Sequence, residues 1–557
     1  FQAEDGIRDF CLSRGLGDVY KRQGIFSIIG DITVFNKTYF DKGSKRGPEC
    51  SIVKKLSQEV LFGFHRLAIN GLNVESNQPI TIDSIVLICN GEIYNYKQLY
   101  KLIDIVPSTD SDCEVIIHMY KKYGINQTLT LLDGVFAFVL YDIEKQEVYV
   151  ARDPYGVRPL YMATVMPMDS NIFQYSYVFS SEMKMIDQDL SDTKITRFYP
   201  GHYLKLVKGV VWEYDLLTKY VNEPCIQYFI NQSSQITMLL RDALENAVRK
   251  RVEVTDRPIA CLLSGGLDSS LITALVCKYT DPTKLKTFSI GLPDSEDVMY
   301  AEKVAKHLNT DHTSILVTED EFFNAIPEVI CAIESYDTTT VRASVGNYLV
   351  AKYIKEHTEC KVIFNGDGAD ELMGGYLYLH AAVDAVEFDK ECRRLLKDIH
   401  QFDVLRSDRS ISSNGLEPRV PFLDRGFVQL YLSIPPALRY HKGNNQIEKY
   451  LIRNAYANTG LLPNEVLWRR KEAFSDGVSK QSRSWYEIIQ EKIPPYVVNE
   501  FKLYRCTWDE DNIPDTAEKY YYRVLFDQMY RMKGASKTIP YYWMPKYVDA
   551  KMCLIHI

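Results

Sequence analysis

Short apolar runs separated by turns fill the first part of the chain. They predict strands over residues 24–30, 62–70, 85–90, 134–142 and 147–152. The last two runs lie close together and predict a hairpin. One helix is predicted from Ser111 to about Tyr123, because Ser and Asp are favourable where a helix begins. Many strands with few helices indicate a sandwich of sheets.

Beyond residue 233 the pattern changes to an alternation of helices and strands. Apolar residues recur at helical spacing over 233–251, after a weakly patterned stretch at 212–232 that we interpret as a linker. Further strands are predicted at 259–263, 286–291, 312–317 and 361–364, with helices from 268 and over 300–308, 322–333 and 344–356. Such alternation predicts a doubly wound parallel sheet, which binds ligands at the carboxyl ends of its strands. From about Leu405 the chain looks mainly helical.

The sequence PIACLLSGGLDSSL, residues 258–271, joins a predicted buried strand to a predicted helix through a tight turn. Unpaired backbone N–H groups at a helix N-terminus bind phosphate, because the helix dipole favours negative charge. Gly265 and Gly266 let the backbone approach the anion closely, and Asp268 can hold Mg²⁺ beside the phosphates. Further hydroxyl donors are Ser264, Ser269 and Ser270.

This turn is not a Walker A loop, because the chain contains no Gly-Lys dipeptide. The pattern Ser-Gly-Gly-x-Asp-Ser is instead typical of enzymes that adenylate a substrate and release pyrophosphate. The alternative is a Gly- and Ser-rich turn that binds no ligand. The strand–turn–helix context favours the pyrophosphate loop.

Composition narrows the class of protein. The 557 residues carry 65 basic and 73 acidic side chains, a net charge of −8. This balance argues against a general nucleic-acid binder, which needs a basic surface. No apolar run approaches the ~20 residues of a membrane span, and no signal peptide is visible. The twelve cysteines include no Cys-x-x-Cys pair, so we expect reduced thiols, no structural zinc and a cytoplasmic location.

Motifs spread over residues 24 to about 545 carry a resemblance to a known family. In chain order they are FHRLAI, NGEIYN, SDCEVI, LDGVFAFVLYD, ARDPYGVRPLY, FSSEMK, PGHYL, LLSGGLDSS, FSIG, TTTVRAS, NGDGADELMGGY, EPRVPFLD, EKYLIR, RRKEAFSDGV and YYWMPKYV. Together they resemble the glutamine-hydrolysing asparagine synthetases, carbon–nitrogen ligases of amino-acid biosynthesis.

The resemblance implies a two-domain α+β and α/β protein. An N-terminal-nucleophile domain, a four-layer αββα sandwich, would be followed by a doubly wound parallel-sheet ATP-pyrophosphatase domain with a helical C-terminal part. We expect a non-native or disordered extension at 1–23, a glutaminase domain at 24–215, a linker at 216–232, a synthetase domain at 233–545 and a tail at 546–557.

The resemblance also implies a glutamine site, at Arg66, Asn90, Gly91, Glu92 and Asp112. Arg66 can bind the α-carboxylate of glutamine bidentately. Glu92 and Asp112 can bind its α-ammonium. The Asn90 side chain and the Gly91 N–H can form an oxyanion hole, in which each donor is typically worth ~3 kcal/mol of barrier.

The catalytic nucleophile of this family is missing. Its members begin with Cys-Gly-Ile, in which the thiol attacks and the free α-amine is the base. Here Gln23 precedes Gly24 and follows 22 other residues, and Cys11 is too far along the chain to substitute. Foreign sequence in place of an original Met-Cys is the favoured explanation, and a natural ammonia-dependent enzyme is the alternative. We expect use of ammonia rather than glutamine.

In the second domain the resemblance implies an ATP site on the 258–271 loop. Phosphates would lie on Ser264 to Ser269, and Asp268 with Asp370 would hold Mg²⁺. The remaining implied contacts are Leu263, Ile290, Asn365 and Gly366 for ATP, and Thr339 with Arg342 for aspartate. Lys449 would neutralise the departing pyrophosphate.

Two segments depart from the family pattern. Asp367 stands where a Glu is common, one methylene shorter, and a 1 Å error in a catalytic carboxylate can cost ~10²-fold. The C-terminal residues 549–557 also differ. In the PRVPFLD motif, Arg419 and Asp424 are interpreted either as a buried ion pair or as substrate contacts.

The expected reaction has two steps. The β-carboxylate of aspartate attacks the α-phosphate of ATP to give β-aspartyl-AMP and pyrophosphate, and ammonia then releases asparagine and AMP. The expected partners are these small molecules, with a homodimer as a possible assembly. Alternatives are a related amidotransferase or β-lactam-forming synthetase, which also lacks the cysteine, or a non-catalytic binder of nucleotide or glutamine. The retained glutamine-site residues argue against a related amidotransferase or β-lactam-forming synthetase. The presence of Asp268 and Asp370 argues against a non-catalytic binder.

Overall fold

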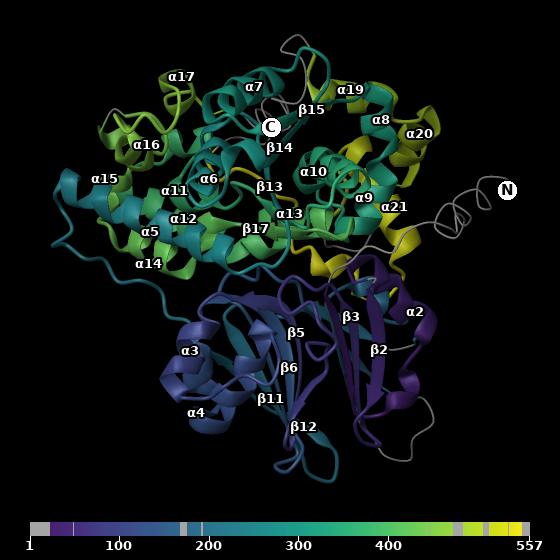
Figure 1. Ribbon diagram of the computed structural model, residues 1–557. Coiled ribbons are helices and arrows are strands. Elements are labelled where there is room, and N and C mark those ends of the chain that lie inside the picture. The colour runs from purple at the N-terminus through teal and green to yellow at the C-terminus, as the bar shows by residue number, and fades with distance from the viewer. Residues whose placement is uncertain are drawn as a thin grey trace.

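The computed structural model describes residues 23–47, 49–166, 175–190, 193–444, 446–471, 483–504, 512–532 and 534–547. These residues form a lower part built around two sheets and a larger upper part with many helices (Figure 1). The predictions made for residues 1–22, for the tail beyond 547 and for most of the RRKEAFSDGV motif lie outside the described residues.

The lower part contains two antiparallel sheets of six strands each. The first has the order β10-β8-β9-β1-β3-β2, with β1 (Gly24–Ile29), β2 (Cys50–Lys55), β3 (Val60–Arg66), β8 (Tyr161–Val165), β9 (Ser176–Ser180) and β10 (Lys194–Arg197). The second has the order β12-β11-β7-β6-β5-β4, with β4 (Ile80–Ile82), β5 (Ile85–Ile93), β6 (Gly134–Asp142), β7 (Glu147–Arg152), β11 (His202–Lys208) and β12 (Trp212–Lys219). The predicted hairpin is confirmed as the antiparallel pair β6–β7.

Apolar side chains fill the space between these two sheets. Alternation along a strand sends Ile25, Phe62 and Phe64 of the first sheet toward Val86 and Val139 of the second. The other face of the second sheet is covered by α3 (Tyr96–Ile103) and α4 (Val115–Leu131), as Figure 1 shows. The predicted sheet sandwich with helical outer cover is confirmed. The outer face of the first sheet packs on α2 (Lys37–Asp41) and on helices of the upper part.

Two local predictions for this part differ from the structure. The predicted helix at 111–123 begins as a 3₁₀ turn at Asp112–Glu114, capped by the Ser111 side chain, and continues as α4 to Leu131. Residues 212–219, which the weak pattern predicted as the start of the linker, form the edge strand β12. Most of that strand is exposed, with Trp212 as its buried anchor, so little hydrophobic pattern marks it.

The upper part is built on a parallel sheet, as predicted. Its order is β15-β14-β13-β16-β17, with β13 (Ile259–Leu262), β14 (Lys286–Gly291), β15 (Asp311–Leu316), β16 (Val362–Phe364) and β17 (Glu417–Arg419). The first strand, β13, lies in the middle, and the chain winds outward to both sides. The switch in direction therefore falls at the carboxyl end of β13, where the 263–268 loop begins.

Helices surround this sheet in Figure 1. They are α5 (Ser233–Glu253), α6 (Leu267–Cys277), α7 (Glu296–Leu308), α8 (Glu319–Asn324), α9 (Ile326–Ile333), α10 (Thr338–His357), α11 (Ala369–Met373), α12 (Ala385–Asp398), α13 (Asp403–Ser412), α14 (Arg425–Ser433), α15 (Pro436–Arg439), α16 (Tyr450–Tyr456), α17 (Asn464–Leu467), α19 (Trp485–Lys492), α20 (Pro495–Tyr504) and α21 (Ala517–Met529). The helix predicted at 322–333 is two helices, with Pro327 in the first turn of the second. None of the described helices is long and apolar enough to cross a membrane.

Buried ion pairs join the two parts. Arg46 and Arg158 of the lower part both contact Asp408 of α13, at 2.7 and 3.2 Å. Arg409, the next residue on α13, contacts Glu182 of the lower part at 3.4 Å. A lone charge left at such a buried site would be costly, so these pairs fix how the two parts are aligned.

Candidate active sites

The side chain of Gln23 lies inside the predicted glutamine site. Gln23 directly precedes β1, and its Oε1 accepts a hydrogen bond from the Gly91 N–H on β5 at 3.2 Å. Its Nε2 donates to the carbonyl of Leu67 at 3.2 Å. A Cβ at Gly91 would lie 2.3 Å from the Val135 carbonyl, so only glycine fits there. The N–H that was predicted to stabilise an oxyanion therefore already donates to a carboxamide of the same chain.

The other predicted oxyanion donor, Asn90, is a buried neighbour on β5. Its Nδ2 lies 3.4 Å from Ser181 Oγ, which also accepts the N–H of Ile25 on β1. This contact ties β5 of one sheet to β1 and the end of β9 of the other. The two predicted oxyanion donors thus lie side by side at the start of β1.

Arg66 lies at the end of β3 and orders the loop that follows it. Its Nη2 donates to the carbonyls of Gly71 at 2.6 Å and Asn73 at 2.8 Å, and its Nε is 3.9 Å from Glu49 Oε2. Burial lowers the pKa of this guanidinium. The structure therefore shows Arg66 buried and already engaged with two backbone carbonyls.

Glu92 and Asp112 are both buried and close enough to influence each other's charge. Burial, reinforced by the Asp112 charge, raises the pKa of Glu92 well above its usual value, and Asn70 donates to its Oε2. Burial raises the pKa of Asp112 to about 6, although the N–H of Ile93, 2.6 Å from its Oδ2, opposes this. An incoming ammonium group would favour the ionised carboxylates, so the pair suits a substrate amine.

The 263–268 loop has the geometry predicted for binding phosphate. Gly265 has a φ of 72°, and a Cβ there would lie 2.5 Å from the Ala301 N. Ser269 Oγ accepts the Ser264 N–H at 3.1 Å and is 2.9 Å from Ser264 Oγ. α6 follows without any side-chain cap, so its first N–H groups and dipole face the loop.

Two carboxylates and two lysines meet next to this loop. Lys449 Nζ lies 2.5 Å from Asp268 Oδ2 and also contacts Asp370 Oδ1. Lys471 Nζ lies 2.7 Å from Asp370 Oδ2. Burial raises the pKa of Asp370, but the charges of Lys449 and Lys471 outweigh it and hold that pKa well below the usual range. The predicted metal ligands and the predicted pyrophosphate lysine are therefore brought together.

Asp367 lies in the same region, on the loop after β16. Its Oδ1 accepts from Arg406 Nη2 at 3.3 Å, and its N–H donates to Asn365 Oδ1 at 3.3 Å. A Cβ on Gly366 would lie 2.8 Å from Ser269 N, so this loop packs directly on the start of α6. An arginine thus holds the shorter carboxylate beside the predicted ATP site.

The predicted aspartate-binding pair lies at the start of α10. Arg342 is buried there, and its Nε and Nη2 donate to the two carboxylate oxygens of Glu518, at 2.8 and 2.7 Å. Its guanidinium also lies over the Tyr486 ring. One edge of Arg342 is therefore already filled by a bidentate pair, and the assignment of Thr339 and Arg342 to aspartate stays a prediction.

The interpretation of Arg419 and Asp424 as a pair with each other is wrong. Arg419 contacts Glu417 at 2.9 Å and Glu92 of the glutamine site at 3.6 Å. Asp424 instead contacts Arg251 of α5 at 2.7 Å and caps α14. Arg419 therefore pairs with Glu417 inside the motif, whereas Glu92 and Arg251 lie far away in the sequence, where the motif could not indicate them.

Comparisons with known proteins match both parts of the chain. A glutamine amidotransferase domain model matches residues 24–212, and an asparagine synthase model matches residues 239–387 and 382–539. The chain is similar to the asparagine synthetase [glutamine-hydrolyzing] of Cricetulus griseus, with 41% identity over 537 residues, 91% of this chain and 93% of that protein. The same-named proteins of Gallus gallus and Homo sapiens share 42% and 40% identity, each over 91% of this chain and 93% of theirs.

The chain belongs to the asparagine synthetase family. The predicted resemblance is thereby confirmed, as is the predicted order of an amidotransferase domain followed by a ligase domain that uses ATP. The amidotransferase match begins at Gly24, so Gln23 is the last residue before the part shared with that model.

Sequence reasoning missed several charged side chains that lie beside the predicted synthetase site. They are Lys471, Arg406, Glu371 and Asp403. Burial and the charges of Asp403 and Asp370 raise the pKa of Glu371 well above its usual value. Glu371 directly follows Asp370, and Lys471 lies in the RRKEAF motif, so a search for charged residues within the motifs could have found both. Arg406 and Asp403 lie on α13, in a stretch without a motif.

Proposed function

We propose that this chain makes asparagine from aspartate and ammonia, with ATP cleaved to AMP and pyrophosphate, and that it does not hydrolyse glutamine. The observation that carries the second half is the position of Gln23. Its carboxamide accepts from Gly91 where a substrate amide would, and its α-nitrogen is acylated by the preceding residue. A carboxamide is no nucleophile, and an acylated nitrogen is no base.

In the first step the β-carboxylate of aspartate attacks the α-phosphorus of ATP, and the bond to pyrophosphate breaks. The N–H groups of the Ser264–Ser269 loop and the dipole of α6 stabilise the charge on the departing pyrophosphate. The ammonium of Lys449 also stabilises the negative charge of the departing pyrophosphate. Its φ of 58° is unusual for a lysine and costs about 1–2 kcal/mol, which favours a functional reason for its position.

Asp268 and Asp370 fit a Mg²⁺ ion. Both are partly buried carboxylates beside the loop, and the Oδ1 of Asp268 accepts no hydrogen bond from the described part of the chain. When bound between these carboxylates, Mg²⁺ would supply positive charge that neutralises the charge developing on the phosphates. Without it, the lysines supply the positive charge that these two carboxylates need.

In the second step ammonia attacks the acyl carbon of β-aspartyl-AMP, AMP leaves, and a proton is released. Asp367 is the proposed proton acceptor or orienting group, held by Arg406. Leu263, Ile290, Asn365 and Gly366 are proposed to contact ATP, and Thr339 with Arg342 to contact aspartate. A cytoplasmic location and a homodimer remain proposals that cell fractionation and light scattering would test.

The test supplies ATP, aspartate and Mg²⁺ together with either ammonium or glutamine. We expect asparagine, AMP and pyrophosphate in equal amounts with ammonium, and neither glutamate nor asparagine with glutamine. AMP formation without asparagine in the presence of ammonium would instead favour a related adenylating enzyme with another acceptor. Glutamate release above the spontaneous rate would contradict the assignment of Gln23.

A further inference from the structure

The end of the described chain, residues 539–547, lies along α12 of the upper part. We term this segment the C-terminal strap. The hydroxyl of Tyr541 donates to Asp398, the last residue of α12. The hydroxyl of Tyr547 donates to the carbonyl of Glu387, in the first turn of the same helix, at 2.9 Å. The strap is therefore fixed at both ends.

Trp543, in the middle of the strap, holds the start of α10 through its backbone. Its N–H donates to Asp337 Oδ1 at 2.7 Å. The other carboxylate oxygen, Oδ2, accepts the N–H and the hydroxyl of Thr340 at 2.8 and 2.7 Å and so caps α10. Asp337 is fully buried, and a buried carboxylate that loses a donor is destabilised. The docked strap and the capped start of α10, which contains Thr339, therefore stabilise each other.

The ring of Trp543 contacts a second segment, the turn that follows α11. Its centroid lies 5.6 Å from that of Tyr376 and 6.3 Å from that of Tyr378. Trp543 is buried, so both rings pack on it in the interior. The hydroxyl of Tyr376 donates to Glu371, the residue after Asp370. Contacts between large rings have specific geometry, so Trp543 determines where this turn lies.

Gly375, the residue before Tyr376, packs directly on the predicted phosphate site. A Cβ on Gly375 would overlap Asp370 Oδ1 and Lys449 Cε. Its N–H also donates to the carbonyl of Asp370 at 2.9 Å. A shift of this turn would therefore displace the carboxylate and the lysine. Trp543 thus contacts both the start of α10 and the turn that packs on Asp370 and Lys449.

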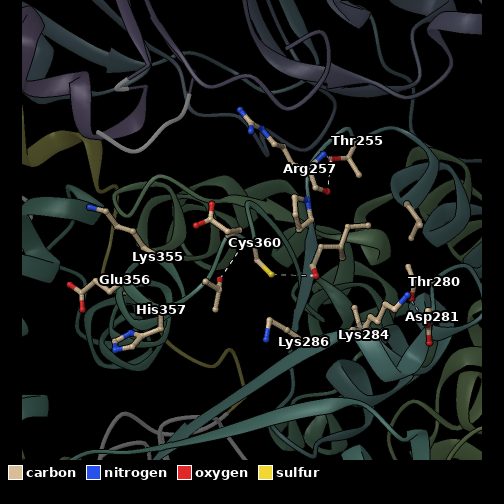
Figure 2. A pocket seen from close by; sticks show the side chains of 16 residues that line it. Thr255, Arg257, Thr280, Asp281, Lys284, Lys286, Lys355, Glu356, His357 and Cys360 are labelled. Atoms are coloured by element: carbon tan, nitrogen blue, oxygen red, sulfur yellow. Dashed lines mark hydrogen bonds and ion pairs between the residues drawn. The ribbon is translucent and has the colours of Figure 1, made fainter. Parts of the chain in front are cut away.

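The amino ends of the parallel strands provide a contrast. A cavity of about 820 Å³ lies there, lined by residues that include Ile259, Lys284 and Lys286 (Figure 2). Its described lining includes no residue of the C-terminal strap and none of the predicted site residues. A substitution in this lining is therefore a suitable control for changes at the opposite, carboxyl end of the sheet.

We propose that Trp543 is a positioning residue for the adenylation step, because it fixes the turn after α11 relative to the start of α10. This role rests on the proposed function, in which aspartate binds at the start of α10 and pyrophosphate departs beside Asp370 and Lys449. The β-carboxylate and the α-phosphate meet only when these two segments are correctly spaced. A misplacement of 1 Å can cost ~10²-fold in rate, so loss of the ring lowers kcat although Trp543 touches neither substrate.

The test measures pyrophosphate release at saturating ATP, aspartate and ammonium. Trp543→Leu keeps the backbone N–H but removes the ring, and we expect kcat to fall ~30-fold. Trp543→Phe keeps an aromatic ring and should lower kcat only ~3-fold. Unchanged kcat in Trp543→Leu would overturn the proposal.

Two controls separate positioning from stability. Tyr431→Ala removes a buried ring of α14 that packs on Phe427. It should lower the thermal transition at least as much as Trp543→Leu but keep kcat within about twofold well below that transition. Lys284→Met, in the cavity of Figure 2, should change neither quantity. An equal loss of kcat in Tyr431→Ala and Trp543→Leu would mean a structural role alone and overturn the proposal.

A double-variant cycle tests whether Trp543 acts through Tyr376. Tyr376→Leu should lower kcat by a similar factor, because it removes the other side of the same contact. The variant with both changes should then be no slower than the slower single variant. Losses that multiply would show that the two rings act independently, and this would overturn the proposal.

Hydrogen exchange keeps this test separate from the proposed function. If the unaltered chain released no pyrophosphate, the proposed function would fail, but the contact would still be measurable. Trp543→Leu should speed exchange at residues 338–342 and 374–378, and Tyr431→Ala should not. Unchanged exchange in both segments would overturn the proposal. If Trp543→Leu does not fold, Trp543→Phe decides it, and full kcat with unchanged exchange in that variant would overturn the proposal.

Discussion

Each half of this molecule places one of its own side chains in its predicted site, but the proposed consequences differ. In the amidotransferase half the carboxamide of Gln23 accepts from the Gly91 N–H. In the synthetase half the ammonium of Lys449 lies between Asp268 and Asp370. Lysine brings a charge that a departing pyrophosphate also needs, whereas a carboxamide brings no nucleophile. Under the proposed function, a side chain of the same protein disables its site only when it stands in place of the reactive group.

The largest effect is expected from a substitution in the synthetase half. Asp268→Asn removes one of two carboxylates beside the phosphate loop, and we expect AMP formation to fall at least ~10³-fold with ammonium as nitrogen source. Release of pyrophosphate measures this directly. Glu245→Gln, in an exposed ion pair with Lys278, is the control and should keep full activity. Activity retained in Asp268→Asn would remove this residue from the site.

The role of the lysine is tested by Lys449→Met. Loss of the ammonium leaves Asp268 and Asp370 facing each other with Lys471 alone, and removes charge from the pyrophosphate site. We expect kcat for pyrophosphate release to fall ~10²-fold. The control Lys278→Met removes a half-exposed lysine and should have no effect on kcat. Equal losses in both variants would mean that Lys449 only stabilises the fold.

The acids of the glutamine site give a pH-dependent effect of intermediate size. The pKa of Asp112 rises from 3.8 to about 6 on folding, so its protonated form stabilises the folded state. This contribution is fully present below pH ~4 and is lost as the pH rises through 6. Between pH 5 and 7 the unaltered chain should lose ~1 kcal/mol of unfolding free energy from this residue.

Asp112→Asn stays neutral at both pH values and keeps an oxygen for the Ile93 N–H. It should therefore lose about 1 kcal/mol less than the unaltered chain between pH 5 and 7, measured as the denaturant midpoint of the first unfolding transition. The substitution also removes the Asp112 charge that helps to raise the pKa of Glu92, so the difference in pH dependence reports the two acids together. Identical pH dependence would mean that Asp112 is ionised in the folded state.

The smallest effect is expected from a substitution of Gln23 in the amidotransferase half. Gln23→Ala leaves the Gly91 N–H without its acceptor and should cost ~1 kcal/mol, a few degrees in the first thermal transition. The emptied site should then admit glutamine, which would raise that transition temperature in Gln23→Ala and not in the unaltered chain. Glutamine must still remain unhydrolysed. Equal stabilisation of both proteins by glutamine would show that Gln23 does not block the site.

The pattern of hydrophobic residues predicted the main strands because these are buried and regular. It could not predict β12, which is exposed on most positions, or β17, which has only three residues with Pro418 in the middle. Proline is tolerated there because β17 is an edge strand that pairs with β16 alone.

Motifs located the functional segments, but not the partners of their charges. The loop at 263–268 follows from local sequence, since strand, glycines and helix are consecutive. Arg342 and Glu518 are 176 residues apart, and Arg419 reaches Glu92 in the other half of the molecule. Only the fold determines such pairs, so Arg342 looked available from its motif although one edge of it is already occupied.

The most direct test rebuilds the missing group. A chain that starts at residue 23, with Gln23→Cys, places a thiol and a free α-amine beside Gly91 and Asn90. If the rest of the glutamine site is intact, this variant should release glutamate from glutamine and make asparagine with either nitrogen source. The control is the same truncation with Gln23 retained, which should make asparagine from ammonium alone. A folded cysteine variant that makes asparagine from ammonium but never releases glutamate would contradict the claim that the nucleophile is all that this half lacks.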